Sequence, residues 1–198
     1  MTTEEILFFD KLAADWDARE VRSTPSRVSE ILASLRLTEG MRILDLGTGT
    51  GVLLPFLSRI VGVDGSIVAV DISEGMLARA RQKFGNLANV DFSKLDFEAE
   101  EIAGRFDVII LYCVYPHLHS PKETFRRLAS QNLTPGGRII IAFPGDESFV
   151  NDIHREKQAN SATLPSAPGL AELLRTWGFD ARVVAYDAAR YIIELRDS

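Results

Sequence analysis

The chain is poor in cysteine: among its 198 residues, Cys113 is the only one. A lone thiol excludes a disulfide within the chain and a metal or redox site built from several cysteines. Because Cys113 directly follows an apolar run, the pattern predicts a small core residue there rather than a nucleophile.

Basic residues and long apolar runs are also scarce. The chain carries 22 Lys and Arg against 28 Asp and Glu, a formal net charge of −6, and its cations are spread out, whereas phosphate neutralisation requires a concentrated basic surface. No apolar run approaches the roughly 18 residues of a membrane span, and the first residues lack the pattern of a secretory leader. We therefore expect a cytoplasmic protein without a nucleic-acid or membrane partner, and we leave its oligomeric state open.

Hydrophobic periodicity divides the chain into a helical extension and an α/β domain. Residues 1–37 hold two amphipathic patterns, with Phe9 and Trp16 on the first and Ile31 and Leu35 on the second. From residue 42, short apolar runs alternate with helical patterns, as in a parallel sheet covered on both faces. The predicted strands are 42–46, 67–71, 90–93, 106–112, 138–143, 181–185 and 191–195, and the predicted helices among them are 52–60, 73–84, 121–132 and 170–177.

The last two predicted strands are separated only by a short run that begins at Asp187 and ends at Arg190. That run is too brief for a crossover, so the two strands should pair antiparallel. The expected fold class is α/β, with one doubly wound, mostly parallel seven-stranded sheet and an antiparallel last strand. Pro55 is expected about one turn into the helix 52–60, where it would remove a hydrogen bond and kink that helix.

A glycine-rich turn follows the first predicted strand, in the run Ile43-Leu44-Asp45-Leu46-Gly47-Thr48-Gly49-Thr50-Gly51. Glycines there allow positive φ and close approach of the backbone to a ligand, and the next helix offers unpaired N–H groups. A tight turn that only packs well is the alternative interpretation. A dinucleotide fingerprint would place its third glycine at Val52, so the sequence disfavours pyrophosphate binding.

Asp71 ends the second predicted strand. At that position a carboxylate can accept both hydroxyl protons of a ribose. The alternative is that Asp71 caps the following helix, but Ser73 suits the N-cap better. We interpret Asp71 as a ribose ligand.

Taken in order, these motifs resemble the class I S-adenosylmethionine-dependent methyltransferases over residues 36–197. The glycine turn is similar to the family's loop around the methionine end, Val70-Asp71-Ile72-Ser73 to its ribose motif, and Asp96-Phe97 to its adenine contacts. The resemblance implies S-adenosylmethionine as cofactor and S-adenosylhomocysteine as product. The cofactor-binding residues it implies are Asp45, Gly47, Thr48, Gly49, Gly51, Asp71, Ile72, Met76, Asp96, Phe97 and Leu111. Asp45 as a loop cap and Asp96 as a turn residue remain alternatives.

The resemblance favours an enzyme that methylates a small-molecule acceptor by in-line transfer. The motif of the family's adenine and amide methyltransferases is absent, since Tyr112-Cys113-Val114-Tyr115-Pro116-His117 stands in its place. The single cysteine also argues against arsenic methylation by a cysteine trio. A non-catalytic S-adenosylmethionine-binding module and a nicotinamide-dependent oxidoreductase are the alternatives. No metal is expected, because Asp146, Asn151 and Asp152 lack a ligand spacing.

The family commonly varies its substrate through two regions of the chain. Accordingly, residues 1–37 are expected to form part of a lid, and residues 144–168 a variable segment over the active site of a single domain spanning 1–198. His154 and Tyr112 are the candidate catalytic residues, because imidazole is well suited to remove a proton near neutral pH. A surface position for His154 is the alternative, and His117, His119 and Tyr115 compete as pocket groups.

Overall fold

A computed structural model describes residues 3–13, 15–16, 23–156 and 162–197. Its core is one seven-stranded sheet in the order β3-β2-β1-β4-β5-β7-β6. All neighbouring strands are parallel except the pairs β5–β7 and β6–β7, which are antiparallel. The predicted fold class is therefore confirmed. The strands are β1 (Arg42–Leu46), β2 (Ser66–Asp71), β3 (Val90–Lys94), β4 (Phe106–Tyr112), β5 (Leu133–Phe143), β6 (Phe179–Asp187) and β7 (Arg190–Asp197).

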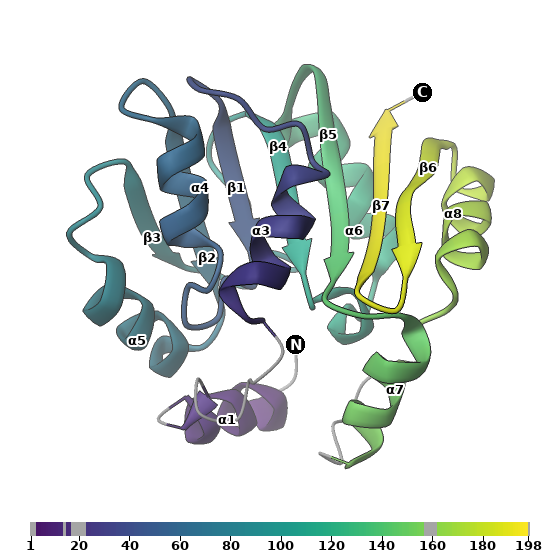
Figure 1. The fold of residues 1–198 in the computed structure, drawn as a ribbon, viewed down its shortest axis with the longest axis horizontal. Coiled ribbons are helices and arrows are strands. Elements are labelled where there is room, and N and C mark those ends of the chain that lie inside the picture. The colour runs from purple at the N-terminus through teal and green to yellow at the C-terminus, as the bar shows by residue number, and fades with distance from the viewer. Residues whose placement is uncertain (1–2, 14, 17–22, 157–161, 198) are drawn as a thin grey trace.

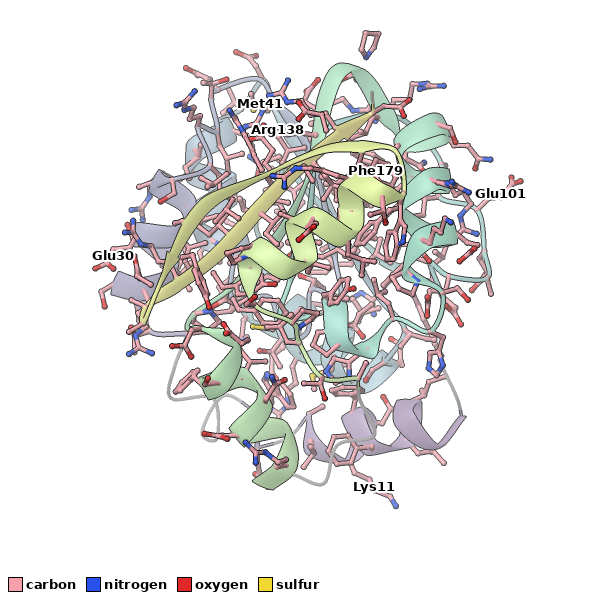
Figure 2. All side chains as sticks on the ribbon, turned by 90° about the vertical axis from the view of Figure 1, so that its right-hand side faces the viewer. Lys11, Glu30, Met41, Glu101, Arg138 and Phe179 are labelled. Carbon is pink, nitrogen blue, oxygen red and sulfur yellow. The ribbon has the colours of Figure 1, made fainter. Side chains whose placement is uncertain are left out.

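Helices cover both faces of this sheet because its central strands are apolar on both sides. One face packs against α3 (Pro25–Ala33), α4 (Leu54–Val61) and α5 (Glu74–Phe84), and the other against α6 (Pro121–Arg127) and α8 (Ala167–Thr176). Figure 1 shows α1 (Thr3–Leu12) and α7 (Glu147–Glu156) at the edge where the parallel strands end. Figure 2, seen from the β6 side, shows the same two helices together at that end. Within the described residues, no helix has the length and apolar character to cross a membrane.

Two sequence-based expectations about single residues are wrong. The helix after the glycine turn begins at Leu54, so Pro55 lies in its first turn, where a missing N–H removes no intrahelical hydrogen bond. Cys113 is exposed and adopts a φ of 60°, because β4 ends at Tyr112 and the chain turns sharply there. The apolar run that precedes Cys113 carries the strand but not the cysteine.

Element boundaries also differ from the periodic patterns. The helix predicted for 121–132 is α-helical only to Arg127 and continues as a π-helical turn over Leu128–Asn132. Strand β5 begins at Leu133, ahead of the predicted start at Arg138. Few side chains of residues 133–137 are buried, so this part of the strand lacks the apolar pattern that predicts a strand. Hydrophobic periodicity in the sequence reveals neither the π-helical turn nor the exposed start of the strand.

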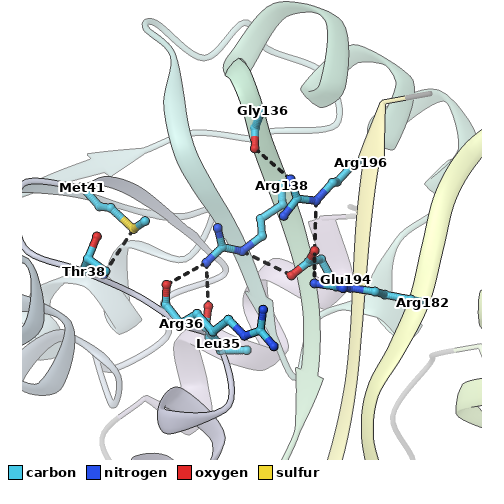
Figure 3. A network of polar contacts seen from close by, with 9 residues as sticks. All are labelled: Leu35, Arg36, Thr38, Met41, Gly136, Arg138, Arg182, Glu194 and Arg196. Carbon is cyan, nitrogen blue, oxygen red and sulfur yellow. Dashed lines mark hydrogen bonds and ion pairs between the residues drawn. The ribbon is translucent and has the colours of Figure 1, made fainter.

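A buried charge network fastens α3 to the sheet (Figure 3), and the position of Arg138 in Figure 2 places it at the end opposite α1 and α7. The guanidinium of Arg138 on β5 donates to the backbone oxygens of Leu35 (2.6 Å) and Arg36 (3.2 Å), just after α3. Its Nε lies 3.4 Å from Oε2 of Glu194 on β7, a buried carboxylate that also pairs with Arg182 at 2.8 Å. Because Glu194 lies beside the guanidinium and two carbonyls accept its hydrogen bonds, a buried arginine can hold the chain that follows α3.

Candidate functional site

The glycine turn after β1 is fixed to the end of β2 by backbone hydrogen bonds. The amides of Gly47 and Thr48 both donate to the oxygen of Val70, at 2.8 and 2.9 Å. Gly47, Gly49 and Gly51 have φ values of 70°, 56° and 84°, the region that favours glycine.

The three glycines serve different purposes. A Cβ on Gly47 would lie 2.5 Å from Cγ2 of Val114, and one on Gly51 would lie 2.9 Å from Cδ1 of Leu54, so both positions require glycine for packing. A Cβ on Gly49 would meet no described atom within 4 Å. Gly49 is thus the position at which bare backbone faces open space, as close approach of a ligand requires.

Asp71 joins this turn to the start of α5. Its Oδ2 accepts from the amide of Gly49 at 2.8 Å, and its Oδ1 accepts from the amide of Ser73 at 2.9 Å. Ser73, not Asp71, caps α5, because its side chain accepts from the amide of Met76. The prediction for Ser73 is confirmed. Burial raises the pKa of Asp71 above its ordinary value, although these amide donors act in the opposite direction.

Asp45 lies beneath the turn, with only 1% of its surface exposed. Its Oδ2 accepts from the hydroxyl of Thr48 at 2.7 Å. Burial raises the pKa of Asp45 to about 7, with the Thr48 hydrogen bond opposing and the charge of Asp71 adding to the rise. Asp45 therefore holds the turn in place through this hydrogen bond, as in the alternative interpretation in which it caps the loop.

A cavity of about 330 Å³ opens where the turn, the end of β2 and the end of β4 meet. Its volume falls in the range of small-molecule sites. Nine residues named from the sequence line it: Gly47, Thr48, Gly49, Asp71, Ile72, Met76, Asp96, Phe97 and Tyr112. Asp45, Gly51 and Leu111 are not among the residues that line it. The side chain of His154 lies outside the described part of the chain, although its backbone belongs to α7.

His117, a pocket group named from the sequence, lines the cavity, whereas the competing Tyr115 and His119 do not. Much of the rest of the cavity lining is apolar, with several aromatic rings. It includes Phe8, Phe9, Trp16, Cys113, Val114, Leu118, Phe143, Pro144 and Val150. The ring of Phe9 packs edge-on against those of Trp16 and His117, with centroids 5.9 and 5.4 Å apart. The hydroxyls of Ser23 and Tyr112 are 2.9 Å apart. The amphipathic stripe of α1 is the signal that the sequence offers, but periodicity does not say which surface a stripe covers.

Two acidic residues on the cavity wall also shape the backbone beside it. Oδ1 of Asp96 accepts from the amide of Glu98 at 3.0 Å, as in the turn alternative for Asp96. The carboxylate of Glu98 accepts from the amides of His119 and Ser120, the latter at 2.9 Å, and so caps the start of α6. Among the described side chains, no group of three or more His, Cys, Asp and Glu residues is placed to hold a metal ion.

The raised pKa of Asp45 yields a prediction about stability against pH. A carboxyl group that holds its proton more tightly in the folded chain releases it on unfolding, so its contribution falls as pH rises from about 4 to 7. The variant Asp45→Asn has no such proton. Its free energy of unfolding relative to the wild type should therefore increase through this window and level off above it, as measured by urea unfolding at pH 5 and pH 8.

The control is Asp64→Asn, at an exposed loop carboxylate, which should show no comparable change between the two pH values. A constant difference between Asp45→Asn and the wild type would show that the pKa of Asp45 is not raised.

Comparison with known proteins identifies the family. A family model described as "Methyltransferase domain" matches residues 37–190. An arsenite methyltransferase of Aquipseudomonas alcaligenes is 36% identical over 169 residues, which cover 77% of this chain and 48% of that protein. A ubiquinone/menaquinone biosynthesis C-methyltransferase of Yersinia pestis is 34% identical over 105 residues, or 52% of this chain and 42% of its own length. The chain thus spans less than half the length of these curated relatives.

Solved structures share this fold. A SAM-dependent methyltransferase from Aquifex aeolicus superposes with a TM-score of 0.70 and 25% identity, covering 87% of this chain and 93% of that one. A DhpI–SAH complex superposes with a TM-score of 0.77 at 20% identity, over 98% and 95% of the two chains. Since the domain model covers most of the chain and the fold matches, the chain belongs to the S-adenosylmethionine-dependent methyltransferase family that its motifs resemble.

Proposed function

We propose that this chain transfers the methyl group of S-adenosylmethionine to a small-molecule acceptor bound beside the cofactor and beneath α1. The observation that carries the proposal is one cavity that is lined by the open backbone of Gly49, the carboxylate of Asp71 and the aromatic side chains of α1. A ligand in this cavity can touch both the glycine turn and these aromatic side chains.

The residues present fit this cofactor. Asp71 has two oxygens that each accept one amide, and an ionised carboxylate offers about four acceptor positions, so capacity remains for ribose hydroxyls. The acidic side chains of Asp71, Asp96 and Glu98 line the cavity, which suits a ligand bearing a sulfonium and an ammonium. Gly47, Thr48 and Gly49 would border the methionine end, with Asp96 and Phe97 near the adenine. Asp45, Gly51 and Leu111 would act by holding this wall in place.

When bound, the cofactor supplies a methyl group on a sulfonium, whose departure leaves a neutral thioether. The chain then has mainly to position the acceptor in line and exclude water. Phe8, Phe9 and Trp16 provide the apolar cover for that purpose. Tyr112, with its hydroxyl 2.9 Å from that of Ser23, would orient the acceptor. His154 remains a candidate base on α7, and His117 is an imidazole on the cavity wall.

The acceptor is therefore proposed to be a compact molecule with an apolar or aromatic body and a hydroxyl, amine or carbon nucleophile. The aromatic rings around the cavity would bury such a body. One relative carries arsenite in its name and another ubiquinone/menaquinone biosynthesis, so relatives of this domain are named for small molecules of different kinds. Arsenite is not the proposed acceptor, because this chain has only one cysteine thiol.

Cofactor selectivity tests the first half of the proposal. At about 100 times its Kd, S-adenosylhomocysteine should stabilise the fold by about 2.7 kcal/mol, and the Tm should rise by about 5–11 °C for a domain of this size. NAD should give no shift, because the turn lacks the dinucleotide glycine pattern. Thermal unfolding with each ligand measures the difference, and an equal shift with NAD would favour an oxidoreductase.

Gly49→Val refines this test, because its side chain would enter the open space that the ligand needs. Gly40→Val is the matched control. Gly40 also has a positive φ, 79°, and a Cβ there would meet no described atom within 4 Å. Gly40 precedes β1, so it lies at the opposite end of this strand from the glycine turn. Both variants should lose similar stability. Only Gly49→Val should lose the shift with S-adenosylhomocysteine, and retention of the full shift would contradict the placement of the ligand.

Turnover tests the second half. Incubation with methyl-labelled S-adenosylmethionine and a panel of small apolar hydroxyl, amine and activated-carbon compounds should give a labelled product with the wild type and Gly40→Val. Gly49→Val should give none. Tight cofactor binding without a labelled product from any member of the panel would instead favour the non-catalytic binding module.

A further inference from the structure

Asp10 of α1 contacts the segment that connects β2 to α5. Its Oδ1 accepts from the hydroxyl of Ser73 at 2.5 Å and from the amide of Gly75 at 3.0 Å. We propose that Asp10 is a positioning residue that latches α1 over the cavity and thereby slows the escape of the bound cofactor. This inference rests on the proposed function for the identity of the ligand, but the latch itself is a property of the chain without ligand.

The chemistry of the contact favours a charged Asp10. The two donors lie at the N-terminus of α5, where unpaired amides and the helix dipole stabilise a carboxylate. The hydrogen bond from Ser73 is the largest cause that lowers the pKa of Asp10, and the amide of Gly75 and the charge of Lys94 lower it further. Asp10 is therefore ionised at neutral pH, and both hydrogen bonds are charge-assisted.

Gly75 provides the matching surface on α5. A Cβ at this position would lie 3.1 Å from Oδ1 of Asp10, 3.2 Å from its backbone oxygen and 3.3 Å from Cβ of Ala13. All three neighbours belong to α1 or the residue that follows it. The close docking of α1 thus depends on the missing side chain of Gly75 as well as on the carboxylate of Asp10.

The latch belongs to the same hydrogen-bond network as the proposed cofactor site. The amides of Gly49 and Ser73 both donate to Asp71, and the hydroxyl of Ser73 donates to Asp10. On the other side, Phe8 and Phe9 of α1 line the cavity. A ligand bound to the Gly49–Asp71 wall is consequently covered by the helix that Ser73 helps to hold.

This arrangement couples closure of α1 to occupancy of the cavity. If the ligand contacts the closed helix, each stabilises the other by the same free energy. Loosening the latch should then accelerate ligand dissociation more than it slows association, because affinity changes among related complexes fall mainly on the dissociation rate.

Two variants disrupt the latch by unrelated chemistry. Asp10→Asn removes the charge, and Gly75→Val inserts a side chain between α5 and α1. Asp64→Asn, at an exposed loop, is the matched control for the loss of a carboxylate. Each latch variant should raise the dissociation rate of S-adenosylhomocysteine about tenfold, the scale expected for weakened hydrogen bonds to a charged group, while the control stays at the wild-type rate. Stopped-flow displacement of the ligand gives these rates.

Hydrogen exchange in the absence of ligand provides the second readout. Amides of residues 3–13 should exchange faster in both latch variants, whereas amides of β4 should keep their wild-type rates. The double variant should dissociate little faster than the more affected single variant, because both changes remove one contact. This non-additivity separates a shared latch from two independent losses of stability.

Three results decide the inference. Faster dissociation together with faster exchange in residues 3–13 supports the latch. Wild-type dissociation and exchange in both single variants would overturn it, even though the wild type binds the ligand. If the wild type does not bind S-adenosylhomocysteine, the proposed function fails, and the exchange data alone support or overturn the contact between Asp10 and α5.

Discussion

The buried carboxylate of Asp71 is the constraint on which the site depends. It accepts one amide from the glycine turn and one from the residue that caps α5. A buried charge is costly unless hydrogen bonds compensate it, so the turn and the start of α5 must both stay in place around it. The same two contacts fix the distance between the open backbone of Gly49 and the end of β2. Through Ser73, they also extend to α1.

The topology of the sheet explains why this carboxylate faces a cavity. Strand order reverses at β1, which pairs with β2 on one side and β4 on the other. The connections from β1 and β4 lead to opposite faces of the sheet, and the crevice between them is where ligands bind in open α/β folds. The glycine turn lies on one side of this crevice, and the Tyr112–Cys113 corner on the other. Helices α1 and α7 stand over the same edge (Figure 1).

Much of this architecture follows from local sequence. The apolar runs place all seven strands, the short Asp187–Arg190 connection gives the antiparallel pair, and the glycine spacing together with Asp71 locates the turn beside β2. These features depend on residues close together in the chain or on strands whose register follows from the pattern. Their physical causes are therefore visible before the fold is known.

Other features depend on contacts between distant segments, and periodicity does not contain them. Asp10 looks like an ordinary charge on α1 until Ser73 and Gly75 are brought against it. Gly51 looks like part of the ligand cradle, and the structure adds that a side chain there would also meet Leu54. Likewise, the aromatic residues of α1 indicate only that one face is buried, and the cavity that this face covers is formed by β1, β2 and β4.

The central claim is that Asp71 binds the ribose of the cofactor, and a double-mutant cycle between protein and ligand tests it most directly. Calorimetry would compare S-adenosylhomocysteine with its 2′,3′-dideoxy analogue on the wild type and on Asp71→Asn. The account predicts that losing the hydroxyls weakens binding to the wild type by about 1–3 kcal/mol and has little further effect on the variant. An equal loss on both proteins would mean that the hydroxyls bind elsewhere and would contradict the account.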